Sequence, residues 1–375
     1  MNKISRLFIV VVVSLTLICV ISPMVCATDS NIDEYAEEFD YESFLSQLDG
    51  DTIHILSEIG ITELSFESVF SVSFGRVFSS LFNIIEEAVK EPLRFLLIST
   101  GIMIMTSLMG ASVKNAQSVQ LVGGGALALS IATPIARTVA SSFSVLEMLG
   151  AFTTAFSGVF CSIISLSGGA IAGIAYTSMT VFFNGLFSGM LSGFSKPVIN
   201  SMCSLGFLSC FDMMGLTSRF SGIIKKIFLF LISFIGTVFS GIVTLKGVLS
   251  EGADNLATRS VRFVVGRSLP VVGGTVSETY SALISSLSLI RSTVGVFGII
   301  TVVVIVMPTL IRLIMWSLSI EIALSLFDVY GLEASKGMFT VIKDALVLLI
   351  ATIIMVTTIF IVSVGVVITM KGGAS

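Results

Sequence analysis

The longest uncharged stretch of the chain constrains its fold more than any other feature. Residues 148–195 form a run of 48 residues without Asp, Glu, Lys, Arg or His. A transmembrane helix needs about 20 mostly apolar residues, so this run predicts two helices joined by a tight turn. The pair Gly168 and Gly169 predicts the turn, because glycine adopts backbone conformations that other residues resist. We expect the rest of the chain to pack around this hairpin.

Composition extends the same prediction to most of the chain. Apolar residues make up 54% and charged residues only 12%, where a soluble domain has about 25% charged residues. The fold class is therefore all-α, a polytopic membrane helix bundle with about seven transmembrane helices. Outside the hairpin, the predicted spans are 95–113, 115–136, 227–245, 292–311 and 345–370. Residues 197–211 form either a short span or half of a re-entrant pair, and a further apolar helix follows Arg312. Breaks or kinks are expected at Gly123–Gly125, Pro134 and Pro308.

The N-terminal region differs sharply in charge. Residues 28–75 contain 12 acidic residues and no Lys or Arg. The chain divides into a signal peptide (1–27), a short acidic extracytoplasmic region with amphipathic helices (28–91) and a polytopic membrane domain (92–375). An uncleaved first membrane helix is the alternative to the signal peptide. Glu91-Pro92 is expected to end an amphipathic helix over 66–90.

Two further features concern topology and helix ends. Arg219, Lys225 and Lys226 predict a cytoplasmic loop, because cytoplasmic segments carry an excess of Lys and Arg. Pro270, Gly273 and Gly274 predict a break between two amphipathic helices within residues 251–291.

A glycine ladder marks the second half of the hairpin. Gly185, Gly189 and Gly193 recur every four residues, with Ser188 and Ser192 beside them. Small residues at this spacing let helix backbones approach closely in lipid. We expect the ladder to mediate helix packing.

A polar stripe follows Arg312. Ser317, Glu321, Ser325 and Asp328 fall on one face of a helix whose other faces are largely apolar. Carboxylates at bilayer depth cost on the order of 2.5–3.5 kcal/mol each, so they usually face a bundle interior or water. Either the stripe faces a pore or a partner, or the helix lies in the membrane interface with its polar face wet.

The sequence contains none of the catalytic motifs that were considered. It has no Walker A motif and no HExxH, and its single histidine, His54, lies in the acidic region. The cysteines outside the signal peptide lie in apolar spans without metal-ligand spacing. We therefore expect no catalytic residue, no cofactor, no metal site and no nucleic-acid binding, with membrane lipid as one partner.

Several short segments, taken in order, resemble one family. They are the signal peptide, the acidic amphipathic region, Leu166–Ala170 at the opening of a glycine-rich helix, Ser268–Gly274, and Val294-Gly295-Val296-Phe297-Gly298. In this order they resemble the stage III sporulation protein AE family of endospore-forming bacteria, over nearly the whole chain. None of the segments is a catalytic motif.

The resemblance implies a function that composition does not. Members of that family belong to a multi-protein complex between mother cell and forespore, which forms a secretion-like channel or feeding tube. It implies a non-enzymatic subunit in the mother-cell membrane around the forespore, a candidate export gate or channel. It also implies an ATPase, ring-forming proteins and small membrane proteins as partners. A self-contained secondary transporter is the alternative, since Gly168-Gly169 and Gly273-Gly274 suggest two related halves. A scaffold for the complex is a further one.

Overall fold

The computed structural model describes residues 50–58, 74–113, 116–166, 170–211, 216–268, 273–330 and 333–369, and these contain helices and no strand. The α-helices are α4 (Gly50–Glu58), α6 (Phe74–Ser112), α7 (Ala116–Leu166), α8 (Ala170–Met190), α9 (Lys196–Leu208), α10 (Leu216–Ser268), α11 (Gly273–Tyr330) and α12 (Glu333–Thr369). A π-helical segment, η1 (Leu191–Ser195), and a 3-10 segment, η2 (Ser209–Phe211), complete the path. The all-α fold class is thus confirmed.

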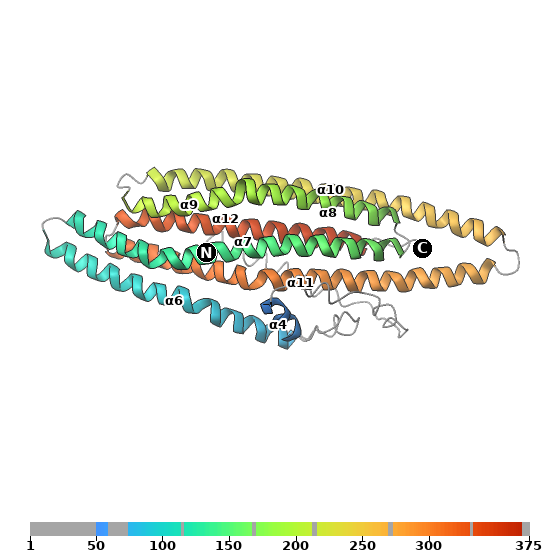
Figure 1. The fold of residues 1–375 in the computed structure, drawn as a ribbon, viewed down its shortest axis with the longest axis horizontal. Coiled ribbons are helices and arrows are strands. Elements are labelled where there is room, and N and C mark those ends of the chain that lie inside the picture. Colours follow the sequence, from blue (N-terminus) through green and yellow to red (C-terminus); the bar gives the residue numbers. More distant parts are fainter. Residues whose placement is uncertain are drawn as a thin grey trace.

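The long helices run side by side along one axis and form an elongated bundle (Figure 1). Successive helices reverse direction, and α8, η1 and α9 together make one return along the bundle. The 58 residues of α11 correspond to about 87 Å at 1.5 Å per residue. The hydrocarbon core of a bilayer is about 30 Å thick, so the helices reach well beyond one hydrocarbon core.

The helices are longer than the sequence predicts. The expected breaks at Gly123–Gly125 and Pro134 are wrong, because α7 continues through them. Glu91-Pro92 does not end a helix either, since Pro92 lies inside α6, and Pro308 lies inside α11. In membrane bundles, contacts with neighbouring helices and local adjustments compensate for the hydrogen bond that proline removes.

These continuous helices also change how the spans divide. The predicted separate spans 115–136 and 148–166 are, from Ala116 on, parts of one helix, α7. Among the described residues, five helical segments are long and apolar enough to cross a membrane. They are Asn83–Ser112, Ser118–Leu166, Leu216–Phe239, Ile290–Tyr330 and Lys336–Ile368, and Ile171–Phe187 is a shorter apolar helix.

The hairpin prediction holds at its turn. α7 ends at Leu166 and α8 begins at Ala170, and the two helices pack on each other. Gly168 and Gly169 lie between them, outside the described residues. The predicted span 197–211 is the continuation of α8 through η1, where Pro197 cannot donate to a carbonyl one turn earlier. A wider π turn accommodates this loss.

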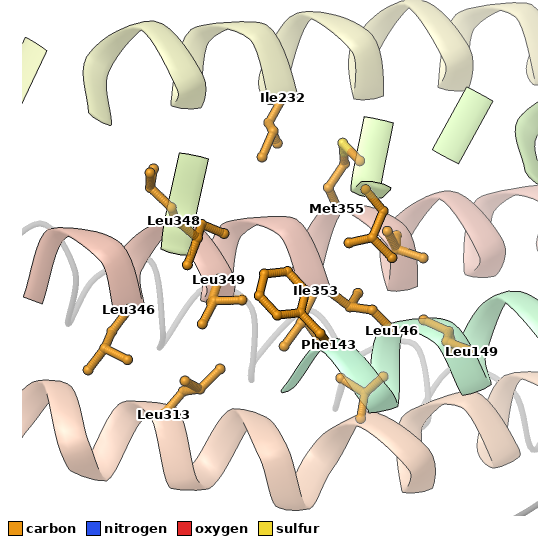
Figure 2. Packing of buried hydrophobic residues seen from close by; sticks show 14 of the residues in the cluster. Phe143, Leu146, Leu149, Ile232, Leu313, Leu346, Leu348, Leu349, Ile353 and Met355 are labelled. Atoms are coloured by element: carbon orange, nitrogen blue, oxygen red, sulfur yellow. The ribbon is translucent and has the colours of Figure 1, made fainter. Parts of the chain in front are cut away.

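The core is centred on α12, which packs against α10, α11, α9 and α7. Figure 2 shows Leu346, Leu349 and Ile353 of α12 among apolar side chains of α7, α10 and α11. These three side chains are fully buried. A second layer of aromatic rings joins α7 to α12, where Phe156 contacts Phe360 with ring centroids 5.5 Å apart.

The N-terminal predictions fall largely outside the described residues, including the signal peptide 1–27. Within the acidic region, α4 packs on α11 and α6. The expected domain boundary at residue 92 lies inside α6, so the end of the amphipathic segment and the first span form one helix.

Candidate functional site: a charge cluster between three helices

Polar side chains gather on the first third of α12, which faces α10 on one side and α11 on the other. All of them lie in helical segments with the composition of membrane spans. Ionisable residues are rare in such segments and usually pair with one another. The cluster is therefore the strongest candidate for a functional site in the described part of the chain.

The most buried charged member is Asp344 of α12, whose side chain is 8% exposed. Lys225 of α10 donates from Nζ to Asp344 Oδ1 at 2.6 Å, and Ser221 Oγ donates to Oδ2 at 3.0 Å. Both carboxylate oxygens are thus satisfied by α10, at positions one helical turn apart. Hydrogen bonds to a carboxylate from a lysine and a hydroxyl satisfy its oxygens inside an apolar bundle.

Glu321 and Asp328 of the polar stripe bond to lysines of α12. Lys343 donates to Glu321 Oε2 at 2.7 Å, and Lys336 donates to Asp328. The acids are seven residues apart on α11 and the lysines seven apart on α12. Since seven residues make two turns, both pairs belong to one antiparallel seam.

The stripe therefore lies at the edge of the α11–α12 seam. Ser325 is exposed and its hydroxyl donates to the carbonyl of Glu321 at 3.1 Å, and Ser317 is half-buried. The opposite face of the same helix is packed into the core, since Trp316, Ile320 and Phe327 are at most 1% exposed. This packing attaches the apolar face of the helix to the bundle, and where the helix lies relative to the membrane interface stays a prediction. That the stripe also faces a pore or another protein stays a prediction.

Lys343 and Asp344 join the two sets of contacts. They are neighbours in the sequence, so their side chains leave α12 about 100° apart and reach α11 and α10 respectively. The cluster fixes the rotation of α12 between its neighbours as well as its height. The described residues hold no group of three or more His, Cys, Asp or Glu side chains able to bind a metal ion.

Sequence reasoning found the acids of α11 and missed their partners. Lys225 was interpreted only as a topology signal, and Lys343 and Asp344 were not singled out. The usable signal was an adjacent Lys-Asp pair directly before a long charge-free stretch, on a helix that follows the polar stripe. Such charges, placed between apolar helices, need partners on both sides.

Two members of the predicted glycine ladder meet no other helix within the described residues. Gly185 and Gly193 are exposed, and a Cβ at either position would meet nothing within 4 Å. The surroundings of Gly189 lie outside the described residues. A contact of the ladder with another protein stays a prediction.

Close helix contacts are made at other glycines. A Cβ on Gly298 would lie 2.4 Å from Cζ of Phe156, and one on Gly295 would lie 2.5 Å from Cδ1 of Ile368. Both glycines belong to the segment Val294–Gly298 that carries part of the family resemblance. Their role is to admit side chains of α7 and α12 against the backbone of α11.

The second predicted helix break agrees with the helix ends. α10 ends at Ser268 and α11 begins at Gly273, so Gly273 and Gly274 are its first two residues. Pro270 lies in the intervening part of the chain, outside the described residues.

Together, the elongated helical bundle, its long apolar helices and the paired charges inside it define a polytopic membrane protein. Comparison with known sequences gives the family. The profile of the family described as Stage III sporulation protein AE matches residues 57–371, and the chain belongs to that family.

The chain is also similar to the Stage III sporulation protein AE of Bacillus subtilis (strain 168), with 19% identity over 224 residues. That match covers 60% of this chain and 56% of the relative, so it spans little more than half the relative's length. No solved structure matches the fold. The names of the family and of this relative both refer to sporulation.

Proposed function

We propose that the chain is a non-enzymatic membrane subunit of the secretion-like channel between mother cell and forespore. It resides in the mother-cell membrane around the forespore and acts there with an ATPase, ring-forming proteins and small membrane proteins. The observation that carries this proposal is the family match over residues 57–371. Five apolar helical segments support the membrane location.

The charge cluster supports a mechanical role for the described bundle within that complex. The ion pairs connect α10, α11 and α12 at defined heights, and two of the lysines are largely buried. A bundle locked in this way is suited to transmit force from a partner or to hold a gate in one position. Glu321 and Asp328 are the more exposed partners in their pairs, at 41% and 59%. They are the members of the cluster that a passing substrate or another subunit can reach.

The test separates structural pairing from a role of the carboxylate. Glu321→Leu alone leaves Lys343 unpaired, so it is expected to lower protein abundance. Glu321→Leu combined with Lys343→Met replaces the pair by apolar side chains and should restore abundance. If the stripe faces a conduit or a partner, spore yield stays low in the double variant, although an immunoblot of the membrane fraction shows a normal amount.

A matched control is the exposed pair Glu147–Lys196, whose atoms lie 3.0 Å apart on α7 and α9. Replacing it by Leu and Met should leave spore yield unchanged. Normal spore yield in the Glu321–Lys343 double variant would assign the stripe to packing alone and leave a scaffold as the better description.

A second candidate function is a self-contained secondary transporter. The buried carboxylate of Asp344 favours it, because ionisable groups in membrane spans often mark ion pathways. Solute flux into liposomes containing only this chain would support the transporter. Flux that appears only together with the proposed partner proteins would support the channel subunit.

A further inference from the structure

An apolar groove lies between α6 and α7. It has a volume of about 580 Å³ and is lined by Leu97, Ile98 and Met105 of α6 and by Val119, Val122 and Ala126 of α7, among others. Leu97 and Val122 are more than 70% exposed. At the base of the groove the two helices touch, since a Cβ on Gly123 would lie 2.3 Å from Oγ1 of Thr106. That hydroxyl donates to the carbonyl of Ile102, so the groove presents little polarity.

The groove has the dimensions of one leaflet of a bilayer. Its lining on α6 runs from Leu97 to Met109, which is about 18 Å along the helix. Half of a bilayer's hydrocarbon core measures about 15 Å. The uncharged stretches 95–113 and 115–136 that contain the groove are each about 30 Å long, so they match a full core.

Two arginines stand at the same end of this groove. The contact of Thr106 with Gly123 sets the antiparallel register, which places Arg94 level with Ile135 and about 3 Å from the height of Arg137. Arg94 precedes Ile98 by one turn on its helix, and Arg137 follows Ala126 by three turns. Both arginines are therefore on the groove side of their helices.

The two guanidinium groups are available to an anion. Both side chains are exposed, and neither forms an ion pair within the described part of the chain. Glu91, the nearest acid before Arg94 on α6, has no ion pair with it. Both uncharged stretches end at these arginines, and charged residues at the end of an apolar stretch are expected near the lipid headgroups.

We propose that this groove binds one anionic phospholipid, with an acyl chain lying between α6 and α7 and the phosphate between Arg94 and Arg137. Guanidinium groups bind phosphate through paired charge-assisted hydrogen bonds, and basic pockets between membrane helices are typical sites for anionic headgroups. A chain in the groove covers apolar surface that the bundle leaves open. Only 22% of the residues in the most apolar stretch of α6 are buried by the protein. The bound lipid thereby adds contacts between α6 and the rest of the bundle.

The test measures lipid binding to the full-length protein in detergent by native mass spectrometry. Phosphatidylglycerol is compared with phosphatidylcholine carrying the same acyl chains. We expect one tightly retained phosphatidylglycerol per chain, and about fivefold weaker binding for Arg94→Gln and for Arg137→Gln separately. Arg219→Gln, which changes an exposed arginine on α10 away from the groove, is the matched control and should bind normally.

Two further measurements keep the proposal falsifiable if an arginine variant is unstable. Gly101→Leu puts a large side chain into the groove at a position where a Cβ meets nothing, so it should exclude the lipid without disturbing helix packing. Free glycerol phosphate should not compete, because the acyl chain supplies part of the affinity. Equal retention of the two lipids by the unmodified protein, normal binding by Gly101→Leu, or displacement by glycerol phosphate would each overturn the proposal.

Discussion

α12 and α6 are both apolar helices, but α12 lies in the centre of the bundle and α6 at its periphery. In the most apolar stretch of α11 and of α12, 61% of the residues are buried inside the protein. The corresponding fraction is 22% in α6 and 17% in the first half of α10. The central helices are also the more hydrophobic, with mean hydropathy of 2.7 and 2.9 against 1.7 and 2.0. Nevertheless α11 and α12 supply five of the ten charged side chains that form ion pairs among the described residues.

This difference shows what places a charge in such a bundle. Lys343 and Asp344 sit in a central helix because neighbouring helices supply their partners at hydrogen-bond distance. On α6, facing outward, Arg94 and Glu91 are exposed and flank the uncharged stretch. Hydropathy therefore identifies the spans, whereas charged side chains with hydrogen-bond partners on neighbouring helices indicate which helix is central.

The sharpest way to break the comparison is to remove the charge at the centre. Asp344→Ala leaves Lys225 and Ser221 without their acceptor. Removing one partner of a buried ion pair typically costs 3–5 kcal/mol, and we expect about 3 kcal/mol here because Lys225 is 24% exposed. The midpoint of thermal unfolding in detergent should fall, together with abundance in the membrane fraction. The double variant Asp344→Leu with Lys225→Met replaces the ion pair by apolar side chains and should recover much of the stability and abundance lost in Asp344→Ala. If neither recovers, Asp344 has a role beyond pairing.

The second prediction compares glycines at the centre and at the periphery. Gly298→Leu forces a side chain against the ring of Phe156, which is 1% exposed and stacked on Phe152 and Phe160. Overpacking of this kind costs about 1–3 kcal/mol. Gly185→Leu, where a Cβ meets nothing, should leave unfolding in detergent unchanged. A loss of complex assembly in Gly185→Leu with normal stability would show that the ladder contacts another protein.

Much of the fold was predictable from residues alone. Uncharged stretches defined the apolar segments, and Gly168-Gly169 placed the turn between α7 and α8 to within a few residues. Continuity was not predictable, because Pro92 and Pro134 end helices in isolation and are tolerated only when neighbouring helices hold the chain. That compensation is tertiary, and no local pattern encodes it.

The site was half predictable for the same reason. The 3.6-residue period of an α-helix was enough to place Glu321 and Asp328 on one helix face, since spacing along a helix is a local property. Their bonds to Lys343 and Lys336 depend on the antiparallel register of α11 and α12, which the packing of side chains such as Phe327 and Phe339 determines. The glycines show the converse case. Gly185 and Gly193 have the expected spacing, but Gly295 and Gly298 meet the neighbouring helices.

The third prediction tests whether the α11–α12 register depends on its charges. Glu321→Lys and Lys343→Glu should each destabilise the bundle, because each variant puts two like charges in contact at a partly buried site. The double variant restores an ion pair and should recover most of the loss, giving a coupling energy of about 1 kcal/mol in a double-mutant cycle. Additive losses in unfolding midpoint would show that the pair does not set the register.

The smallest effect is expected at the outer pair of the same seam. Asp328 and Lys336 are 59% and 39% exposed, against 41% and 18% for Glu321 and Lys343. Ion pairs this open to solvent contribute about 0–1 kcal/mol, because water screens the attraction and fixing two long side chains costs entropy. The double variant Asp328→Asn with Lys336→Gln should therefore lower the unfolding midpoint by less than the single charge reversals at Glu321 or Lys343 do. Added salt should reduce the effect of the Asp328–Lys336 variant further. If the outer variant is as damaging as the inner one, this end of the seam is buried by another subunit or by lipid, and the exposure of the isolated chain does not describe the working state.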